Sequence, residues 1–216
     1  MANRRILLDI EVQKDFFDSG GNCYSAENRR AFAQIRRLFK WARACNVPVM
    51  STLLRVRSGW RGPLSPIPHC VDGTDGEHKM RGTILPSRIN LGLRNTTDLP
   101  LHLFDRYQQV VFEKRHTDIF AHARAERLLT ELDPRTFILC GAGVARGIAE
   151  AAIGLRSRGF PVVLASDAVA DLDDPLAEMA CLRMEAKGVV FVPTREIIAP
   201  RPVQHPAVFR SSVRAG

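Results

Sequence analysis

Three segments far apart in the chain carry residue types that could do chemistry. Glu11 follows the apolar run 5–10, Lys114 follows the run 109–112, and a glycine-rich turn, 141–147, follows the run 136–140. An acid at the mouth of a buried strand can serve as a general acid or base, because burial raises its pKa towards the working range. A lysine there can stabilise an anion. Backbone N–H groups at a helix start can hold an anion or oxyanion.

Each segment also has a purely structural interpretation. Glu11 could pair with a basic residue, Asp9 could cap nearby backbone groups, and Lys114 could be solvated at its strand end. The glycines of the turn lack the final spacing of a dinucleotide-binding fingerprint. Strand alternation predicts Asp9 and Glu11 on one face, and two carboxylates that close would keep at least one proton bound.

Short apolar runs alternate with amphipathic stretches along the chain, which predicts a three-layer α/β/α fold. Its sheet is doubly wound, mainly parallel and six-stranded, with helices on both faces. In such a sheet, ligands bind beyond the carboxyl ends of the strands, where the three segments end. Ser25 and Asp174 are candidate helix caps. The expected strands are 5–10, 47–53, 109–112, 136–140, 161–165 and 189–192, and the expected helices are 26–44, 121–132, 144–158 and 175–187.

Two segments fall outside this alternation. The segment 58–103 is long and rich in Gly, Pro and polar residues, with at most a short helix near 86–91, and loops of this length are often lids or binding loops. The segment 199–216 has no periodicity and is interpreted as a tail or an arm on a neighbouring subunit. The prediction is one domain over 1–198 and a tail over 199–216.

Composition limits the function classes. Of 216 residues, 45% are hydrophobic, and no apolar run reaches the length of a membrane span. The start of the chain lacks the apolar core of a secretory signal, so we expect a cytoplasmic protein. Five scattered cysteines argue against a disulfide framework and a zinc site. The net charge of +8 comes from dispersed arginines, which makes nucleic acid an unlikely partner, and an anionic small substrate explains it equally well.

Together, these segments resemble the isochorismatase-like superfamily, which includes nicotinamidases, other amidohydrolases and isochorismatases. The likeness covers residues from about 5 to 195. The opening is similar to the family's strand that ends in Asp-x-Gln-x-Asp-Phe, and Lys114 with Phe120 is similar to its Lys segment. The turn resembles Gly-Val-x-x-x-x-Cys, 165–170 looks like the family's Asp-Ala strand end, and 69–76 looks like the nicotinamidase loop.

The resemblance implies a catalytic triad of Asp, Lys and Cys, and this chain departs from it twice. Lys114 matches, Glu11 stands where the aspartate belongs, and Gly147 stands where the nucleophilic cysteine belongs. Cys140 lies seven residues too early to replace it. A thioester mechanism needs a positioned thiolate, so amidase activity is not expected. The longer acid would move the carboxyl by about 1.5 Å, and a shift of about 1 Å can cost about 100-fold in rate.

Isochorismatases also resemble this pattern, with glycine at the cysteine position. The resemblance then implies vinyl-ether hydrolysis, in which an acid protonates a carbon and water adds without a covalent intermediate. Glu11 would be the acid, with Lys114 beside it and Gly147 leaving room for substrate. The isochorismatase turn usually carries Tyr-Ala-His before the glycine, whereas this chain has Val144-Ala145-Arg146. The candidate substrate-binding residues are Phe16, Phe17, Trp60, Gly143, Val144 and Arg146, although core packing also explains the two phenylalanines.

No cofactor and no metal are expected. The nicotinamidase metal cluster would follow the second strand, where 51–57 offers no ligand, and His69 matches a family metal histidine but stands alone. Two hypotheses remain: a thiol-independent hydrolase of a small, anionic compound, and a catalytically inactive relative that keeps the fold for binding or assembly. The resemblance favours a homo-oligomer in both.

Overall fold

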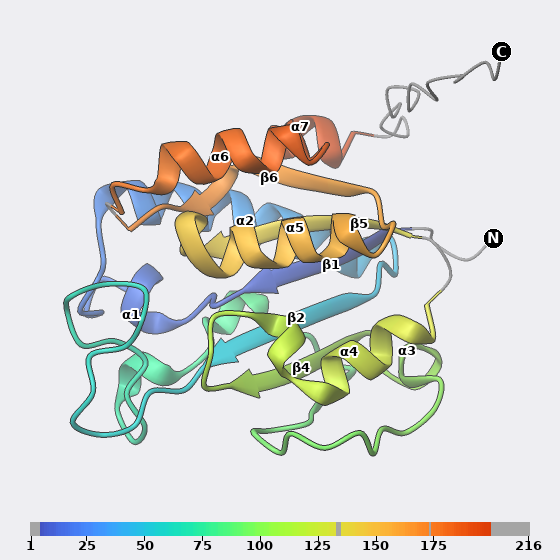
Figure 1. Cartoon of the computed structure of the whole chain (residues 1–216), viewed down its shortest axis with the longest axis horizontal. Coiled ribbons are helices and arrows are strands. Elements are labelled where there is room, and N and C mark those ends of the chain that lie inside the picture. Colours follow the sequence, from blue (N-terminus) through green and yellow to red (C-terminus); the bar gives the residue numbers. More distant parts are fainter. Residues whose placement is uncertain (1–4, 133–134, 173, 200–216) are drawn as a thin grey trace, which may run out of the picture.

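The computed structural model describes residues 5–132, 135–172 and 174–199, and these form a three-layer α/β/α arrangement around one parallel sheet (Figure 1). The strand order in space is β3-β4-β2-β1-β5-β6-β7. All pairs of neighbouring strands are parallel, as the alternation of apolar runs and helices predicts. The strands are β1 (Arg5–Ile10), β2 (Val49–Leu54), β3 (Arg88–Asn90), β4 (Gln109–Lys114), β5 (Thr136–Ala142), β6 (Val162–Ala170) and β7 (Val190–Val192).

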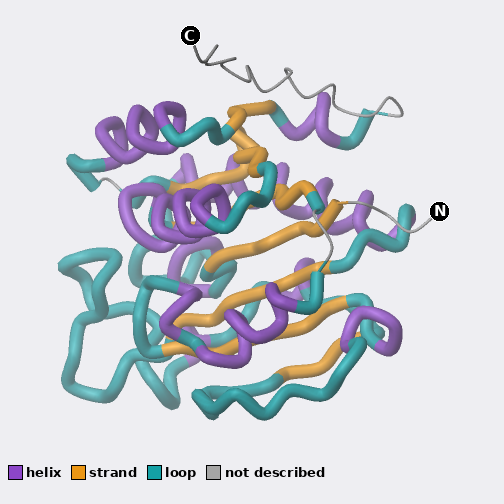
Figure 2. The backbone as a smooth tube through the Cα atoms, turned by 45° about the vertical axis from the view of Figure 1, so that its right-hand side comes forward, coloured by secondary structure: helices purple, strands orange, loops and turns teal. Residues whose placement is uncertain are grey.

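Helices cover both faces of the sheet (Figure 2). The longest, α2, packs on one face against the core that contains Leu7 and Ile138. Helices α4, α5 and α6 contribute to the core on the other face, which contains Leu8 and Phe112. The helices are α1 (Lys14–Phe17), α2 (Ala26–Ala44), α3 (Leu103–Arg106), α4 (Ala123–Thr130), α5 (Ala149–Ser157), α6 (Ala177–Ala186) and α7 (Thr194–Ile197).

Local sequence explains where α2 begins and which side it buries. The hydroxyl of Ser25 accepts a hydrogen bond from the backbone N–H of Asn28, which satisfies one of the free donors of the first turn. Ile35, Leu38 and Phe39 repeat at helical spacing, and all three are buried against the sheet. The predicted cap and amphipathic face are therefore both confirmed.

The sheet has one more strand than the sequence predicts. The segment 86–91, for which the sequence suggests at most a short helix, contains β3, whose Arg88, Ile89 and Asn90 pair with β4. Pairing with β4 satisfies backbone groups of this stretch, and Ile89 packs on the core. Strand β6 also runs past the expected end at residue 165 to Ala170, with a register shift beside β5.

Strand β1 lies at the point where the chain changes direction across the sheet. Ile10 at its carboxyl end pairs with Thr52 of β2 on one side and with Gly141 of β5 on the other. Further out, Leu54 of β2 pairs with Lys114 of β4. A crevice at such a point is where open parallel sheets bind ligands, and all three predicted segments end there.

None of the helices in the described part of the chain is long and apolar enough to cross a membrane. Of the tail predicted over 199–216, all but residue 199 lies outside the described residues, as do residues 1–4.

Candidate active site

Glu11 and Lys114 form a buried ion pair at the carboxyl edge of the sheet. Lys114 Nζ lies 2.8 Å from Glu11 Oε1, and both side chains are almost completely buried. Thr52 of β2, the strand between them, donates its hydroxyl to the same oxygen at 2.7 Å. One hydroxyl and one ammonium therefore meet on Oε1, and the acid and its electrostatic partner predicted from the sequence lie in one site.

The backbone at Glu11 departs from the strand. Its φ of 48° lies in the left-handed region, which is uncommon for a residue with a β-carbon. The backbone N–H of Glu11 still donates to the carbonyl of Thr52 at 3.3 Å, and its own carbonyl accepts from Gln13 N at 2.8 Å. Conformations of this kind cost about 1–3 kcal/mol and cluster at functional sites, so the chain holds Glu11 in a position that β1 alone would not give.

The ammonium of Lys114 also holds the loop after β4. It donates hydrogen bonds to the carbonyl oxygens of His116 at 2.8 Å and Thr117 at 2.7 Å. Together with the ion pair to Glu11, these bonds fix the carboxylate and the loop relative to one another.

The second oxygen of Glu11 faces Gly147. Oε2 is buried and has no hydrogen-bond partner in the described part of the chain. A β-carbon placed on Gly147 would lie 3.0 Å from it, with Ile10 Cγ2 at 3.3 Å and the carbonyl of Thr117 at 3.6 Å. Buried carboxylate oxygens in folded proteins are normally hydrogen-bonded. The unpaired oxygen therefore stands where the sequence places the missing nucleophile.

Gly147 lies in a π-helical turn, Val144–Ile148, that joins β5 to α5. Gly143 begins the turn with a φ of 79°, and a β-carbon there would lie 2.9 Å from Leu64. Val144 is buried in the core. Arg146 is half-exposed, and its Nε lies 3.5 Å from Asp174 Oδ2, so this arginine has an acidic partner before the start of α6.

Asp9 does not share the site, so the expected common face with Glu11 is wrong. Asp9 accepts hydrogen bonds from Ser51 and Lys79, whereas Glu11 contacts Thr52. Adjacent residues of a strand point to opposite faces, so Ser51 and Thr52 mark opposite sides of β2. The left-handed turn at Glu11 breaks the alternation on which the expectation rested.

Gln13 and Asp15, the other polar residues of the opening motif, hold loops. The Gln13 amide bonds to both backbone groups of Leu54 and to the carbonyl of Glu77, each at 2.8 Å. Asp15 accepts from Cys70 N at 2.6 Å. The motif therefore fixes the long segment after β2 to the end of β1, which positions the site.

The predicted apolar walls separate into two groups. Phe16 packs against the ring of His69, and Phe17 against the ring of Phe32, and both belong to the core on the α2 side. Phe16 and Phe17 therefore pack in the core, and not at the substrate position that was expected for them. Trp60, by contrast, is 71% exposed and lines a surface pocket.

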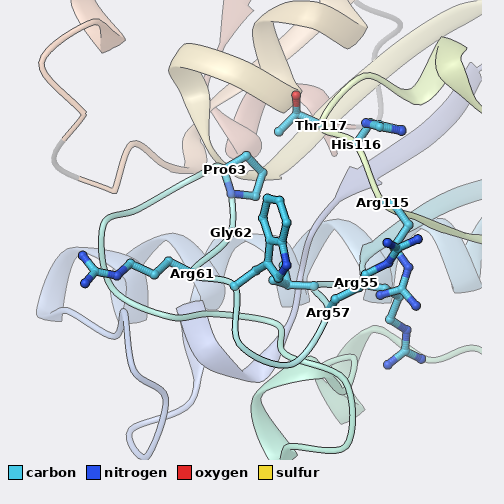
Figure 3. A pocket seen from close by; sticks show the side chains of 10 residues that line it. Arg55, Arg57, Arg61, Gly62, Pro63, Arg115, His116 and Thr117 are labelled. Carbon is cyan, nitrogen blue, oxygen red and sulfur yellow. The ribbon is translucent and has the colours of Figure 1, made fainter.

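That pocket lies beside the buried site and has a volume of about 780 Å³ (Figure 3). Thr117, whose carbonyl accepts from Lys114, is one of its lining residues, whereas Glu11, Lys114 and Gly147 are not. Ten residues line it: Arg55, Val56, Arg57, Trp60, Arg61, Gly62, Pro63, Arg115, His116 and Thr117. Four arginines and no acidic residue among these ten make the pocket suited to an anion.

His69 does not fit a metal ligand. Its Nε2 accepts from the backbone of Leu64 at 3.2 Å, and its Nδ1 lies 2.8 Å from the carbonyl of Ile67. Both ring nitrogens are therefore used by the loop that His69 supports. The described residues contain no group of three His, Cys, Asp or Glu side chains that could hold a metal ion. The donor set that the nicotinamidase resemblance would require is not formed by these residues.

The cysteines do not replace the missing nucleophile. Cys140 and Cys70 are buried, and burial raises the pKa of each thiol well above its usual value. A buried thiol with a raised pKa is a poor nucleophile. For Cys140, the negative charge of Asp9 adds to this effect.

Sequence analysis missed several residues that shape the site. Thr52 was not expected to contact Glu11, although two adjacent hydroxyl residues within a fully buried strand are a signal for polar partners. Thr117 contributes through its backbone, which residue type does not reveal. The arginines of the pocket wall were seen only as dispersed charge.

The family comparison agrees with this geometry. The model of the isochorismatase domain matches residues 5–196. No curated protein sequence matches the chain significantly.

Several solved structures share the fold. A nicotinamidase of Bacillus subtilis has a TM-score of 0.66 at 18% identity, over 88% of this chain and 99% of its own. An isochorismatase family protein of Desulfovibrio vulgaris has a TM-score of 0.66 at 20% identity, over 90% of this chain and 96% of its own. An N-carbamoylsarcosine amidase of Thermoplasma acidophilum has a TM-score of 0.62 at 16% identity, over 88% and 96%. With the family model matching nearly all of the described residues, this chain belongs to the isochorismatase domain family.

Proposed function

We propose that this protein hydrolyses a small anionic compound without a thiol nucleophile, with Glu11 as the acid or base. One observation carries the proposal: Glu11 Oε2 is buried, has no partner among the described residues, and faces Gly147. A buried acceptor without a donor is costly. A ligand that supplies a proton or a donor at this atom would remove that cost.

The two oxygens of Glu11 have different tasks in this mechanism. Oε1 is held by Thr52 and Lys114, so its position is fixed before a substrate arrives. Oε2 is the atom that can carry a proton to the substrate and take one back from water. In a vinyl-ether hydrolysis, the acid protonates the carbon of the double bond, and water adds to the resulting cation. The hemiketal then loses its alcohol, and the proton returns to the carboxylate.

Lys114 acts as a positioning residue. It forms an ion pair with Glu11 and donates to two backbone carbonyls, so its role is to hold the carboxylate in place. The mechanism uses no cofactor and no metal.

A second function is favoured by the complete burial of Glu11. The carboxyl has no exposed surface, and it is not among the residues that line the arginine-rich pocket. A protein that binds a small anion in this pocket without turnover would need only the pocket. Glu11 and Lys114 would then be a structural pair that supports the loop after β4. Assembly into a homo-oligomer and a cytoplasmic location remain predictions under both functions.

The experiment is a hydrolysis screen over vinyl ethers, amides and esters of small acids, with Glu11→Gln as the test variant. Asp9→Asn is the matched control, because Asp9 lies two residues before Glu11, is equally buried and is also paired with a lysine. We expect turnover by the native chain, loss of at least about 100-fold in Glu11→Gln, and retention in folded Asp9→Asn. Turnover that survives in Glu11→Gln would remove Glu11 from the mechanism. No turnover of any compound, together with binding of small anions, would favour the second function.

A further inference from the structure

The arginine-rich pocket beside the site distributes its positive charge unevenly. Arg55 is held by two acids: its Nη1 lies 2.5 Å from Glu77, and its Nη2 lies 2.8 Å from Glu113. Arg115 pairs with Asp72 at 2.6 Å. In the described part of the chain, the guanidinium groups of Arg57 and Arg61 have no ion-pair or hydrogen-bond partner. These two are therefore the groups available to a ligand.

The two available arginines point in different directions. Figure 3 shows the guanidinium of Arg57 on the same side of the pocket as those of Arg55 and Arg115, while the Arg61 side chain extends away from them. Glu113 accepts hydrogen bonds from Arg55, and the positive charge of Arg115 also acts on the Glu113 carboxylate. Arg55 and Arg115 therefore lie near one another. Because Glu77, Glu113 and Asp72 pair with Arg55 and Arg115, Arg57 supplies the unpaired positive charge on this side of the pocket among the described residues.

Trp60 provides the second element of recognition. It lies in the same turn as Arg57, because its backbone N–H donates to the Arg57 carbonyl at 3.1 Å. Its indole is 71% exposed and lines the pocket, although large aromatic side chains normally bury their apolar surface. An exposed indole next to arginines is a surface on which a planar ring can stack. The pocket volume of about 780 Å³ is within the range of about 300–1,000 Å³ for small-molecule sites.

From these features we propose that the pocket binds planar ring compounds that carry a phosphate group, with the ring on Trp60 and the phosphate on Arg57. A phosphate suits Arg57 because its oxygens can accept two parallel N–H bonds from one guanidinium, and its second negative charge strengthens these bonds relative to those of a carboxylate. The proposal rests on the proposed function in one respect: it assigns the substrate class of the hydrolase to the pocket that borders Thr117. Binding itself requires no turnover.

The test is isothermal titration calorimetry with four probes: phenyl phosphate, benzoate, phenol and inorganic phosphate. We expect phenyl phosphate to bind most tightly, because only this probe offers both the ring and the doubly charged group. Arg57→Ala should weaken phenyl phosphate binding by about tenfold or more. Arg61→Ala is the matched control from the same pocket and should change it less than about threefold. Both side chains are exposed, so neither change should disturb folding.

Trp60→Ala separates the ring contact from the charge contact. We expect about a tenfold loss for phenyl phosphate and little change for inorganic phosphate, because only the former stacks. In the native chain, quenching of Trp60 fluorescence gives a second readout, since the other tryptophan, Trp41, is buried under Arg5. Three results would overturn the proposal: benzoate or phenol binding as tightly as phenyl phosphate, equal losses in the two arginine variants, or no binding of phenyl phosphate.

Failure of this inference is distinguishable from failure of the proposed function. Glu11→Gln leaves the pocket lining unchanged and should bind phenyl phosphate as the native chain does. Hydrolysis of another compound that depends on Glu11, without phenyl phosphate binding, would overturn the ligand class alone. Binding of phenyl phosphate without any hydrolysis would leave the ligand class standing and favour a binding protein.

Discussion

The Oε2 atom of Glu11 lies 3.0 Å from the point where a β-carbon of residue 147 would stand. This distance is at the lower limit of real contacts with a β-carbon, so the longer acid and the absent side chain fit one another. An aspartate would withdraw the carboxyl by about one C–C bond, roughly 1.5 Å. The two differences from the triad that the resemblance implies therefore compensate each other in volume: the longer side chain of Glu11 reaches the space that a side chain at position 147 would occupy.

This relationship predicts energetic coupling between the two positions. Gly147→Ala should force Glu11 Oε2 to shift, whereas in a Glu11→Asp background the new methyl group has room. We expect the alanine substitution to be more favourable by about 1 kcal/mol in the aspartate background, measured as the free energy of unfolding in urea. Gly20→Ala is the control, because nothing lies within 4 Å of its added carbon. Additive effects of the first pair would contradict this compensation in volume.

The same geometry limits how a nucleophile can be restored. Gly147→Cys alone places a thiol against the Glu11 carboxyl, which crowds it and raises its pKa by charge repulsion. The double variant Glu11→Asp with Gly147→Cys gives the thiol space beside Lys114. We expect amidase turnover to be at least about tenfold higher in the double variant than in the single one, measured on small aromatic amides. Equal turnover in the two would show that crowding by Glu11 is not the obstacle.

Removing the cation from the buried pair should be costly. Lys114→Met leaves the carboxylate of Glu11 without its ion partner and the carbonyls of His116 and Thr117 without donors. We expect a loss of about 3–5 kcal/mol in the free energy of unfolding. Arg30→Met breaks an exposed pair with Glu27 and should cost less than about 1 kcal/mol. A smaller loss when Glu11→Gln accompanies Lys114→Met would confirm that the unpaired charge is the cause.

The meeting of Glu11, Lys114 and Gly147 was predictable because each lies at or after the carboxyl end of a parallel strand, and these ends meet at one edge of the sheet. The contact of Thr52 with Glu11 was not, since it depends on the left-handed backbone at Glu11. Strand alternation, which ignores that turn, misplaced Asp9. Short-range patterns fail where one residue leaves the regular conformation of its element.

The pocket wall was also beyond prediction, for a different reason. The segment that carries Arg57 and Trp60 has no periodicity, and its path is fixed by distant contacts such as the bond from Arg55 N to the Lys114 carbonyl. The three residues of β3 are too few to show alternation. In both cases, the information lies in partners far along the chain.

Two buried histidines predict acid sensitivity. Burial lowers the pKa of His69 and of His122 from the value of about 6.5 in an unfolded chain. Below pH 6.5, the unfolded state binds protons that the folded state does not, so stability is full above this pH and is lost as the pH falls towards the folded pKa values. Each histidine should contribute a slope of up to about 1.4 kcal/mol per pH unit.

The measurement is the free energy of unfolding in urea between pH 7 and pH 5. His69→Gln and His122→Gln should each reduce the slope, while His102→Gln, at an exposed position, should leave it unchanged. An identical slope in all three variants would mean that carboxylates, not these histidines, govern the acid side.

Alkylation tests whether any thiol takes part in turnover. Cys45 is exposed, and Cys23 and Cys181 are half-buried, whereas Cys70 and Cys140 are buried and their pKa values are raised by burial. Iodoacetamide at pH 8 should therefore modify Cys45 first and leave Cys70 and Cys140 intact until the chain is unfolded, as peptide mass spectrometry would show. Because the proposed mechanism uses no thiol, turnover of a substrate should survive complete modification of Cys45. Loss of turnover in step with modification of Cys140 would instead assign the chemistry to a thiol and overturn the role of Glu11 as the acid or base.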